Sequence, residues 1–386
     1  MPQLVFIASL LKTLFASLIG IAGLGFLIGF HELGHFLFCK LFGIHTPSFS
    51  IGFGPSLFSK KIGDTVFSLS LVPLGGYVEI AGLAEIGQGE QAHAKQKGTS
   101  SFNAKPYYQK LLVMLGGILF NLFFAYIAFI FVFFSGIPKT HLISANTPIP
   151  IILKTSKESA AEKAGLLPYD KIVQVENTII ERSVEPIKNI LAQSQGEPFS
   201  VIVERNNTRI SLLLTPEKTI VQGKETWIMG ATYDVETPII TSFSEAFYRG
   251  INETHHWIIQ TIKGFCACKK LGAIKEMAGP VMILSMMMKA ASESLLLFMV
   301  ILAVISINLA ILNLIPLPIL DGGQLLFCTI EALIGRPLPE KARIFIHMVT
   351  WGLFVLLFIF LTYQDITRIA IPVKQYVENL FHSIQK

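Results

Sequence analysis

The feature that most constrains this chain is a set of four long stretches without a charged side chain. They lie between Lys12 and His31, Lys110 and Lys139, Glu293 and Asp321, and Arg343 and Asp365. About 20 consecutive apolar residues are enough for a helix to cross the hydrocarbon core of a bilayer. The sequence therefore predicts a polytopic α-helical membrane protein with four transmembrane helices and the lipid bilayer as a partner.

Composition agrees with this interpretation. Of the 386 residues, 52% are hydrophobic and only 15% are charged, whereas soluble domains average about 25% charged residues. A net charge of +5 over the whole chain gives no basic stripe, so we expect no nucleic-acid partner. The four cysteines form no CxxC pair and are too few for a disulfide scaffold, and we expect unpaired thiols.

The loops predict how the chain is oriented. The first span is followed by no small-residue cleavage site, so we expect a permanent helix and not a signal peptide. Lys and Arg gather between spans 1 and 2 and between spans 3 and 4, which predicts that both loops are cytoplasmic. The long insert between spans 2 and 3 is then extracytoplasmic. The apolar run 281–288 is too short to cross, and we expect it to be interfacial or to face a partner helix.

Residues 138–237 have the composition of a soluble domain. Strand-like runs occupy 171–177, 199–205 and 209–216, and 184–194 has helical spacing. The segment SAAEKAGLLPYDKIVQVEN resembles part of a PDZ domain, although Tyr169 stands where most such domains have glycine. The resemblance implies one PDZ-like α/β domain that binds an extended peptide at a sheet edge. The alternative is another small α/β domain.

The chemical signal lies at the end of the first span, in the sequence His31-Glu32-Leu33-Gly34-His35. Two histidines four residues apart share one helical face, so both imidazoles can reach one Zn²⁺. Glu32, next to the first histidine, can take a proton from a zinc-bound water. Ionisable groups in an apolar span are costly unless they are paired, metal-bound or functional. The alternative is a polar cluster near the headgroups.

A catalytic zinc needs a third protein ligand. Asp321 is the first charge after the uncharged run 294–320, and the predicted orientation puts it at the same membrane depth as the two histidines. Pro316 and Pro318 precede it and break the helix. Asn308 and Asn313 can bind a substrate backbone or stabilise an oxyanion. Their alternative role is hydrogen bonding between helices.

Together these motifs resemble a known family. HELGH in the first span, N-x-x-P-x-P-x-LDG in the third and a PDZ-like insert are similar to the site-2 proteases, and specifically to the RseP-like subgroup. The stretch 73–78, PLGGYV, and Gly116-Gly117 with Asn121 also match. The chain departs from the pattern at Gln324, where many members have histidine, at Gly117, where Gly-Pro is usual, and in having one PDZ-like domain.

The resemblance implies an intramembrane zinc endopeptidase that cleaves transmembrane segments of single-pass membrane proteins, such as anti-sigma factors or signal-peptide remnants. It implies His31, His35 and Asp321 as zinc ligands and Glu32 as the base. It also implies regulated intramembrane proteolysis in a bacterial cytoplasmic (inner) membrane. The alternatives are a metal or proton transporter and a silent scaffold that presents a PDZ domain.

Two further expectations concern the substrate. A helical substrate must unwind before water can attack its carbonyls, and we expect the membrane-associated β-loop at 67–80 to add a strand to it. In that loop Gly75, Gly76 and Tyr77 are the candidate substrate-binding residues; the alternative is an ordinary cytoplasmic hairpin. We expect the PDZ-like domain to exclude substrates with large outer domains.

The predicted order of segments runs along the whole chain. It comprises helix 1 with HExxH (1–40), the cytoplasmic loop with the β-hairpin (41–109), helix 2 (110–137), the PDZ-like domain (138–237), an amphipathic connection (238–293), helix 3 with LDG (294–322), helix 4 (343–365) and a C-terminal tail (366–386).

Overall fold

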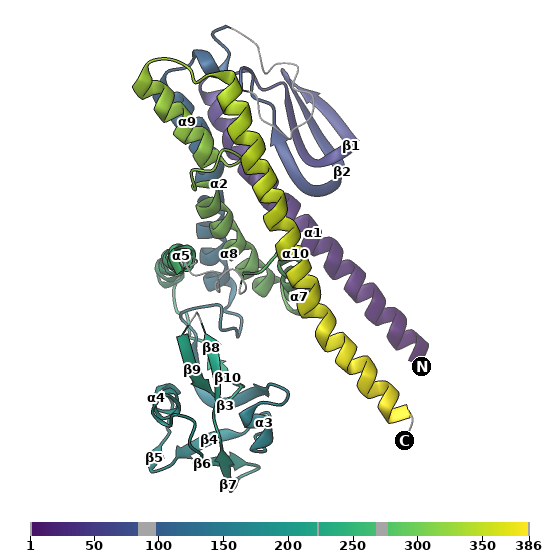
Figure 1. Ribbon diagram of the computed structural model, residues 1–386, viewed down its shortest axis with the longest axis vertical. Coiled ribbons are helices and arrows are strands. Elements are labelled where there is room, and N and C mark those ends of the chain that lie inside the picture. The colour runs from purple at the N-terminus through teal and green to yellow at the C-terminus, as the bar shows by residue number, and fades with distance from the viewer. Residues whose placement is uncertain (1, 84–97, 222–223, 268–276, 385–386) are drawn as a thin grey trace. The chain divides into compact units, whose positions relative to one another are not determined.

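A computed structural model describes residues 2–83, 98–221, 224–267 and 277–384 (Figure 1). Two compact units divide the chain. The membrane unit contains Met1–Val132, Trp257–Ile262 and Met277–Lys386, and the insert unit contains Phe133–His256 and Lys263–Glu276. Cys268 and part of the expected connection 238–293 lie outside the described residues. Among the described residues, Cys266 and Cys328 are free thiols.

Four described helices are long and apolar enough to cross a membrane, as the sequence predicts. The candidate spans are Leu10–Leu41, Tyr107–Ser135, Leu295–Asn313 and Lys341–Arg368. They belong to α1 (Pro2–Leu41), α2 (Tyr107–Ser135), α8 (Leu295–Asn313) and α10 (Glu340–Ile384). The last of these continues as helix to Ile384, within the range 366–386 for which the sequence predicts a tail.

The range 294–322, expected as one helix, is divided in two. Helix α8 ends at Asn313, and a new helix, α9 (Asp321–Ile334), begins at the predicted zinc ligand. Pro316 and Pro318 lie in the connection, where they can give no backbone N–H to a continuing helix. Asp321 is therefore the first residue of a separate helix.

In the described part of the expected connection there are two more helices. They are α5 (Phe243–Ala267) and α7 (Pro280–Glu293). The run 281–288 lies within α7, which contacts α1, α8 and α10. Buried Asp365 of α10 accepts the backbone N–H groups of Gly279 and Met282 at 3.0 and 2.8 Å and so caps the start of α7. Of the two expectations, packing against partner helices describes this segment.

The loop after α1 forms β1 (Ser48–Ile62) and β2 (Thr65–Val78), followed by the short 3-10 helix η1 (Phe102–Ala104). Three residues of β1 each have two partners in β2. Ile51, for example, lies opposite both Leu69 and Gly76. The start of β1 thus lies between two segments of β2, and residues 76–78 pair, among the described strands, with β1 alone.

Alternation of the backbone shows which groups of that segment do not pair with β1. The N–H of Glu79 donates to Ser48 of β1 at 2.9 Å. Residues two apart point their backbone groups to the same side of a strand. Tyr77 therefore faces β1 as Glu79 does, whereas Gly76 and Val78 turn their N–H and C=O groups to the outer edge of the sheet.

The insert unit is built on one sheet whose strands run in the order β10-β3-β4-β6-β7, with β5 paired to β4. Its elements are β3 (Thr147–Thr155), α3 (Ala160–Lys163), β4 (Lys171–Val175), β5 (Thr178–Ile179), α4 (Glu185–Gln193), β6 (Phe199–Arg205), β7 (Thr208–Leu214) and β10 (Ala231–Glu236). A separate hairpin joins β8 (Glu217–Val221) to β9 (Lys224–Ile228). The strand predictions at 171–177, 199–205 and 209–216 and the helix at 184–194 are confirmed.

An ion pair between buried Asp170 and partly exposed Arg205 holds the turn into β4. Arg205 donates to both carboxylate oxygens of Asp170 at 2.7 Å, and the backbone N–H of Leu167 donates at 2.9 Å. Burial raises the pKa of Asp170, but the hydrogen bonds and the charge of Arg205 outweigh burial and hold that pKa below its ordinary value. Tyr169 adopts φ +71°, the backbone conformation that glycine would supply at this turn.

Candidate metal centre

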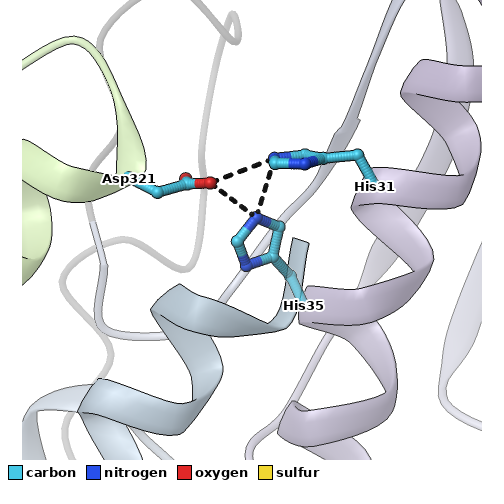
Figure 2. A group of neighbouring side chains, drawn as sticks. All are labelled: His31, His35 and Asp321. Atoms are coloured by element: carbon cyan, nitrogen blue, oxygen red, sulfur yellow. Dashed lines mark hydrogen bonds and ion pairs between the residues drawn. The ribbon is translucent and has the colours of Figure 1, made fainter. Parts of the chain in front are cut away.

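Three predicted ligands meet in the membrane unit. His31 and His35 project from one face of α1, and Asp321 reaches them from the first residue of α9 (Figure 2). Oδ2 of Asp321 lies 3.1 Å from Nε2 of His31 and 3.4 Å from Nε2 of His35. The two Nε2 atoms are 3.2 Å apart. In the described ranges, His31, His35 and Asp321 form the only group of three His, Cys, Asp or Glu side chains placed to hold one metal ion.

The triangle has the dimensions that zinc requires. Tetrahedral ligands at 2.0–2.1 Å from a zinc ion lie about 3.3–3.4 Å from one another, close to the separations between these three atoms. Oδ2 of Asp321 is buried and has no hydrogen-bond donor. A buried anionic oxygen without a donor is costly unless a cation faces it. The residues therefore fit a zinc ion.

Helix α2 provides a hydrogen-bond partner for Nδ1 of each imidazole. The carbonyl oxygen of Val113 lies 2.8 Å from Nδ1 of His35 and accepts its proton, so a neutral ring has its Nε2 lone pair free. Asn121 lies 3.0 Å from Nδ1 of His31, and its own Oδ1 is buried without a donor. Turning the Asn121 amide places Oδ1 against Nδ1–H of His31 and satisfies both groups. Such partners orient metal-bound histidines.

Close approach of α1 and α2 depends on glycine. A Cβ atom on Gly34 would collide with the carbonyl oxygen of Gly116, and one on Gly116 would lie 2.7 Å from that of Gly34. Gly117 lies directly beside the metal position, since its Cβ would be 2.5 Å from Nε2 of both His31 and His35. Val113, Gly117 and Asn121 recur every fourth residue and so share the helical face toward α1.

Replacing Gly117 with alanine is expected to weaken zinc binding by at least about tenfold, because the added methyl group occupies space beside both ligand nitrogens. Zinc content and the rate of zinc loss to a chelator measure this. Gly352→Ala is the matched control, because a Cβ at that position of α10 meets nothing within 4 Å. Equal zinc retention in the two variants would contradict the assignment.

Glu32 lies between the metal centre and the β-hairpin. Its carboxylate faces the backbone N–H of Val78, and a Cβ on Gly76 would lie 3.6 Å from its Cγ. The outer edge formed by Gly76 and Val78 therefore runs past the side chain next to the first histidine. Tyr77 is half-buried and pairs with Ser50 of β1.

The two asparagines of α8 differ in their surroundings. Thr261 of α5 donates to Oδ1 of Asn308 at 2.9 Å, which is the interhelical role weighed as the alternative for this residue. Asn313 ends α8 and is half-buried. In the described ranges no hydrogen bond to its side chain is found, so its amide is available near the start of the proline-rich connection.

Sequence reasoning missed part of this site. It did not assign a role to the Val113 carbonyl or to the contact between Gly117 and the imidazoles, and Asn121 entered only through the family resemblance. The four-residue spacing of these positions was the available signal. It marks a helical face, but it does not say which helix that face meets.

Comparisons with known proteins agree with the geometry. A family model described as peptidase family M50 matches residues 19–358. A zinc metalloprotease RasP from Geobacillus kaustophilus is 29% identical, over 89% of this chain and 96% of the relative. Putative zinc metalloproteases from Helicobacter pylori strain J99 and from a Nostoc species are 31% and 32% identical, over 91% and 94% of this chain and 99% of each relative.

Proposed function

The chain belongs to peptidase family M50, the site-2 proteases, and is a zinc metalloprotease; on that premise we propose that it cleaves transmembrane segments of single-pass membrane proteins, with His31, His35 and Asp321 as zinc ligands and Glu32 as the base. The observation that carries the proposal is the free strand edge of Gly76 and Val78 beside Glu32. An unwound substrate backbone bound there lies against the base and next to the metal position.

The reaction follows from these positions. Zinc, when bound, polarises a peptide carbonyl and makes water more acidic. Glu32 accepts a proton from the attacking water at its carboxylate and returns it to the leaving amine. Asn121 and the Val113 carbonyl hold the two imidazoles in the tautomer that leaves Nε2 free. The amide of Asn313 can donate to a substrate carbonyl or to the oxygen on which charge develops.

The strand edge solves a problem specific to helical substrates. Carbonyl groups in a transmembrane helix are occupied by hydrogen bonds four residues along, and leaving them unpaired in lipid costs several kcal/mol each. Backbone groups of Gly76 and Val78 can replace those bonds by adding the substrate as a strand. The backbone N–H of Val78 faces the Glu32 carboxylate, so a strand bound at this edge lies beside the proposed base.

Replacing Gly76 with valine is expected to lower cleavage by about 100-fold while zinc content stays at the wild-type level. A side chain there starts 2.9 Å from the Ser50 carbonyl and 3.6 Å from Glu32, and a misplacement of about 1 Å can cost about 100-fold in rate. Gly75 is a poorer test, because its Cβ would overlap the Phe53 ring within the hairpin. Fragment yield and bound zinc are measured together.

Gly54→Asn is the control for this prediction. Gly54 is in the same hairpin at φ +87°, which asparagine tolerates better than most residues, and a Cβ there meets nothing within 4 Å. Cleavage by Gly76→Val at the rate of Gly54→Asn would remove the strand-edge proposal.

We further propose that the insert unit is a PDZ-like domain that excludes substrates with large outer domains. Its sheet, its short helix α3 before β4 and its helix α4 before β6 support this. Of the two end strands of the described sheet, β10 and β7, we expect a peptide to add at β10. A clasp formed by Ser144 and Glu253 joins the two connections of the domain: Glu253 accepts from the N–H and the hydroxyl of Ser144 at 2.9 and 2.6 Å.

Breaking this clasp is expected to relax the filter. Glu253 is 2% exposed, so Glu253→Ala leaves Ser144 without its buried acceptor and frees the connection before β3. We expect substrates with an intact outer domain to be cut at least about tenfold faster, a change of about 1.4 kcal/mol in barrier, with trimmed substrates unchanged. The assay compares intact and trimmed forms of one substrate.

Glu245→Ala is the matched control, because Glu245 lies on the same helix but bonds Thr241 and Arg249. Deletion of residues 140–236 gives the upper limit of the effect. Intact substrate that stays uncut in the deletion would show that the domain is no filter.

We place the enzyme in the bacterial cytoplasmic membrane, with the insert unit outside. Lysines and arginines between spans 1 and 2 and between spans 3 and 4 support cytoplasmic loops, and the metal centre then lies toward the cytoplasmic face. This arrangement suits regulated intramembrane proteolysis, in which an outer cut precedes the cut in the membrane.

The proposed function is tested with the purified full-length chain in vesicles. A model single-pass peptide should be cut within its apolar segment, with the bond identified from the fragment masses. Zinc uptake by the same vesicles is measured in parallel. Zinc transport without cleavage would replace the peptidase proposal with a transporter.

A further inference from the structure

The segment that carries Asp321 has little regular structure to hold it. Between Asn313 and Asp321 the backbone makes short turns, with Leu317 bonded to Ile315 at 2.7 Å and Leu320 to Leu317 at 2.8 Å. No side chain caps the start of α9. The position of the Asp321 carboxylate therefore depends on what fastens this connection and the first turn of α9.

Gln324, one helical turn after Asp321, is the side chain that does so. Its Nε2 lies 3.4 Å from the carbonyl of Pro318 in the connection and 3.3 Å from Nε2 of His347 in α10. Arg343 of α10 donates to its Oε1 at 3.1 Å. Gln324 and His347 are each 6% exposed. One buried amide thus links the connection, α9 and α10.

Both donors and one of the two acceptor positions of the amide are used. Both protons of Nε2 can be donated, to Pro318 and to His347, while Oε1 accepts from Arg343. His347 then accepts at Nε2, which fixes its ring with the proton on Nδ1. Phe327 of α9 packs against both partners. The Arg343 guanidinium lies over its ring, 5.7 Å from the centroid, and the centroid of the His347 ring is also 5.7 Å away.

The first turn of α9 is also in direct backbone contact with the connection. A Cβ on Gly322 would lie 2.5 Å from the carbonyl oxygens of Leu314 and Ile315, and one on Gly323 would collide with Leu317. Because Gly322 and Gly323 have no side chain, the two backbones touch directly, and a shift of the connection also shifts Asp321.

We propose that Gln324 is a positioning residue for the zinc ligand Asp321. It holds the backbone at Pro318 and the start of α9 against α10. It thereby sets the distance of the Asp321 Oδ2 atom from the two imidazoles. The inference rests on the zinc site proposed above. His347 and Arg343 act through their hydrogen bonds with Gln324.

The experiment uses the full-length chain, purified and loaded with cobalt or zinc. Gln324→Met keeps the shape of the side chain but loses its hydrogen bonds. We expect the visible absorption bands of bound cobalt to shift and zinc to leave about 10- to 100-fold faster to a chelator. The kcat should fall by a similar factor with KM nearly unchanged, because substrate binding at the strand edge is untouched.

Two further variants separate positioning from general packing. Gln324→Glu keeps the acceptor for Arg343 but cannot donate to Pro318, and should also lose zinc faster; it carries the test if Gln324→Met does not fold. Thr329→Val removes the contact of Thr329 with Tyr107 elsewhere on α9 and should keep wild-type cobalt bands. His347→Gln, which retains an acceptor oxygen, should keep them too.

Wild-type cobalt bands and wild-type zinc loss in Gln324→Met or Gln324→Glu would overturn the inference and leave the zinc site standing. The same shift in Thr329→Val as in Gln324→Met would overturn it as well, in favour of packing. A wild-type chain that takes up no zinc or cobalt would overturn the proposed function and this inference together.

Discussion

Replacing Glu32 with glutamine is expected to leave about one zinc per chain and to lower cleavage of a transmembrane peptide by at least about 1,000-fold. General acid–base catalysis contributes about 100- to 10,000-fold in enzymes, and Glu32 is the ionisable side chain next to the first histidine that also borders the strand edge. Glutamine keeps the shape and can still face Val78, but it cannot accept a proton from water.

Zinc content by mass spectrometry and fragment yield are measured on the same preparation. Glu79→Gln is the matched control, because Glu79 lies just beyond β2 and accepts from the Ser48 hydroxyl. Cleavage that survives in Glu32→Gln would remove Glu32 as the base, and loss of zinc in that variant would show that its role is structural.

Replacing Asp321 with asparagine is expected to lower zinc affinity by more than about 100-fold, beyond the 10- to 100-fold typical of residues that only support a ligand. The amide is neutral, so the buried oxygen that faces the two imidazoles no longer balances the charge of the ion. Cleavage falls with the zinc. Equilibrium dialysis against a zinc buffer measures the affinity.

Glu331→Gln tests whether any carboxylate of α9 would serve. Glu331 lies toward the other end of the same helix, where it accepts the N–H of Leu338 at 3.0 Å. We expect wild-type zinc affinity in this variant. Asp321→Asn protein that binds zinc as tightly as Glu331→Gln would contradict the ligand assignment.

The parts of the fold that the sequence predicts are those that local pattern controls. The four apolar stretches determine helices by length and hydropathy alone, and alternating residues in the insert determine β6 and β7. His31 and His35 lie on one face because four residues make about one helical turn. That Asp321 meets them needed no more than a matching membrane depth.

The remainder depends on contacts between segments distant in sequence. Nothing local to Asn121 says that it faces His31, and nothing local to Gly76 says that its backbone edge is free, because both facts depend on which neighbour packs alongside. Asn308 illustrates the same limit. Its sequence position suits substrate binding equally well, and only the packing of α5 shows Thr261 at its carbonyl oxygen.

The helix break before Asp321 was predictable, but its consequence was not. Pro316 and Pro318 announce an interruption, yet the separate helix α9 and the attachment of its first turn through Gln324 emerge only from the packing against α10. The sequence marks Gln324 only as a departure from the family pattern, and its contacts with Pro318, His347 and Arg343 come from packing.

The central claim is most directly tested by returning zinc stepwise to metal-free protein in vesicles while bound zinc and cleavage within a single-pass peptide are measured together. Cleavage should be absent without zinc, rise in proportion to bound zinc and stop rising at about one zinc per chain, as a site with three protein ligands requires. Undiminished cleavage in the metal-free protein, or one bound zinc with no cleavage of the membrane-embedded bond, would contradict the account.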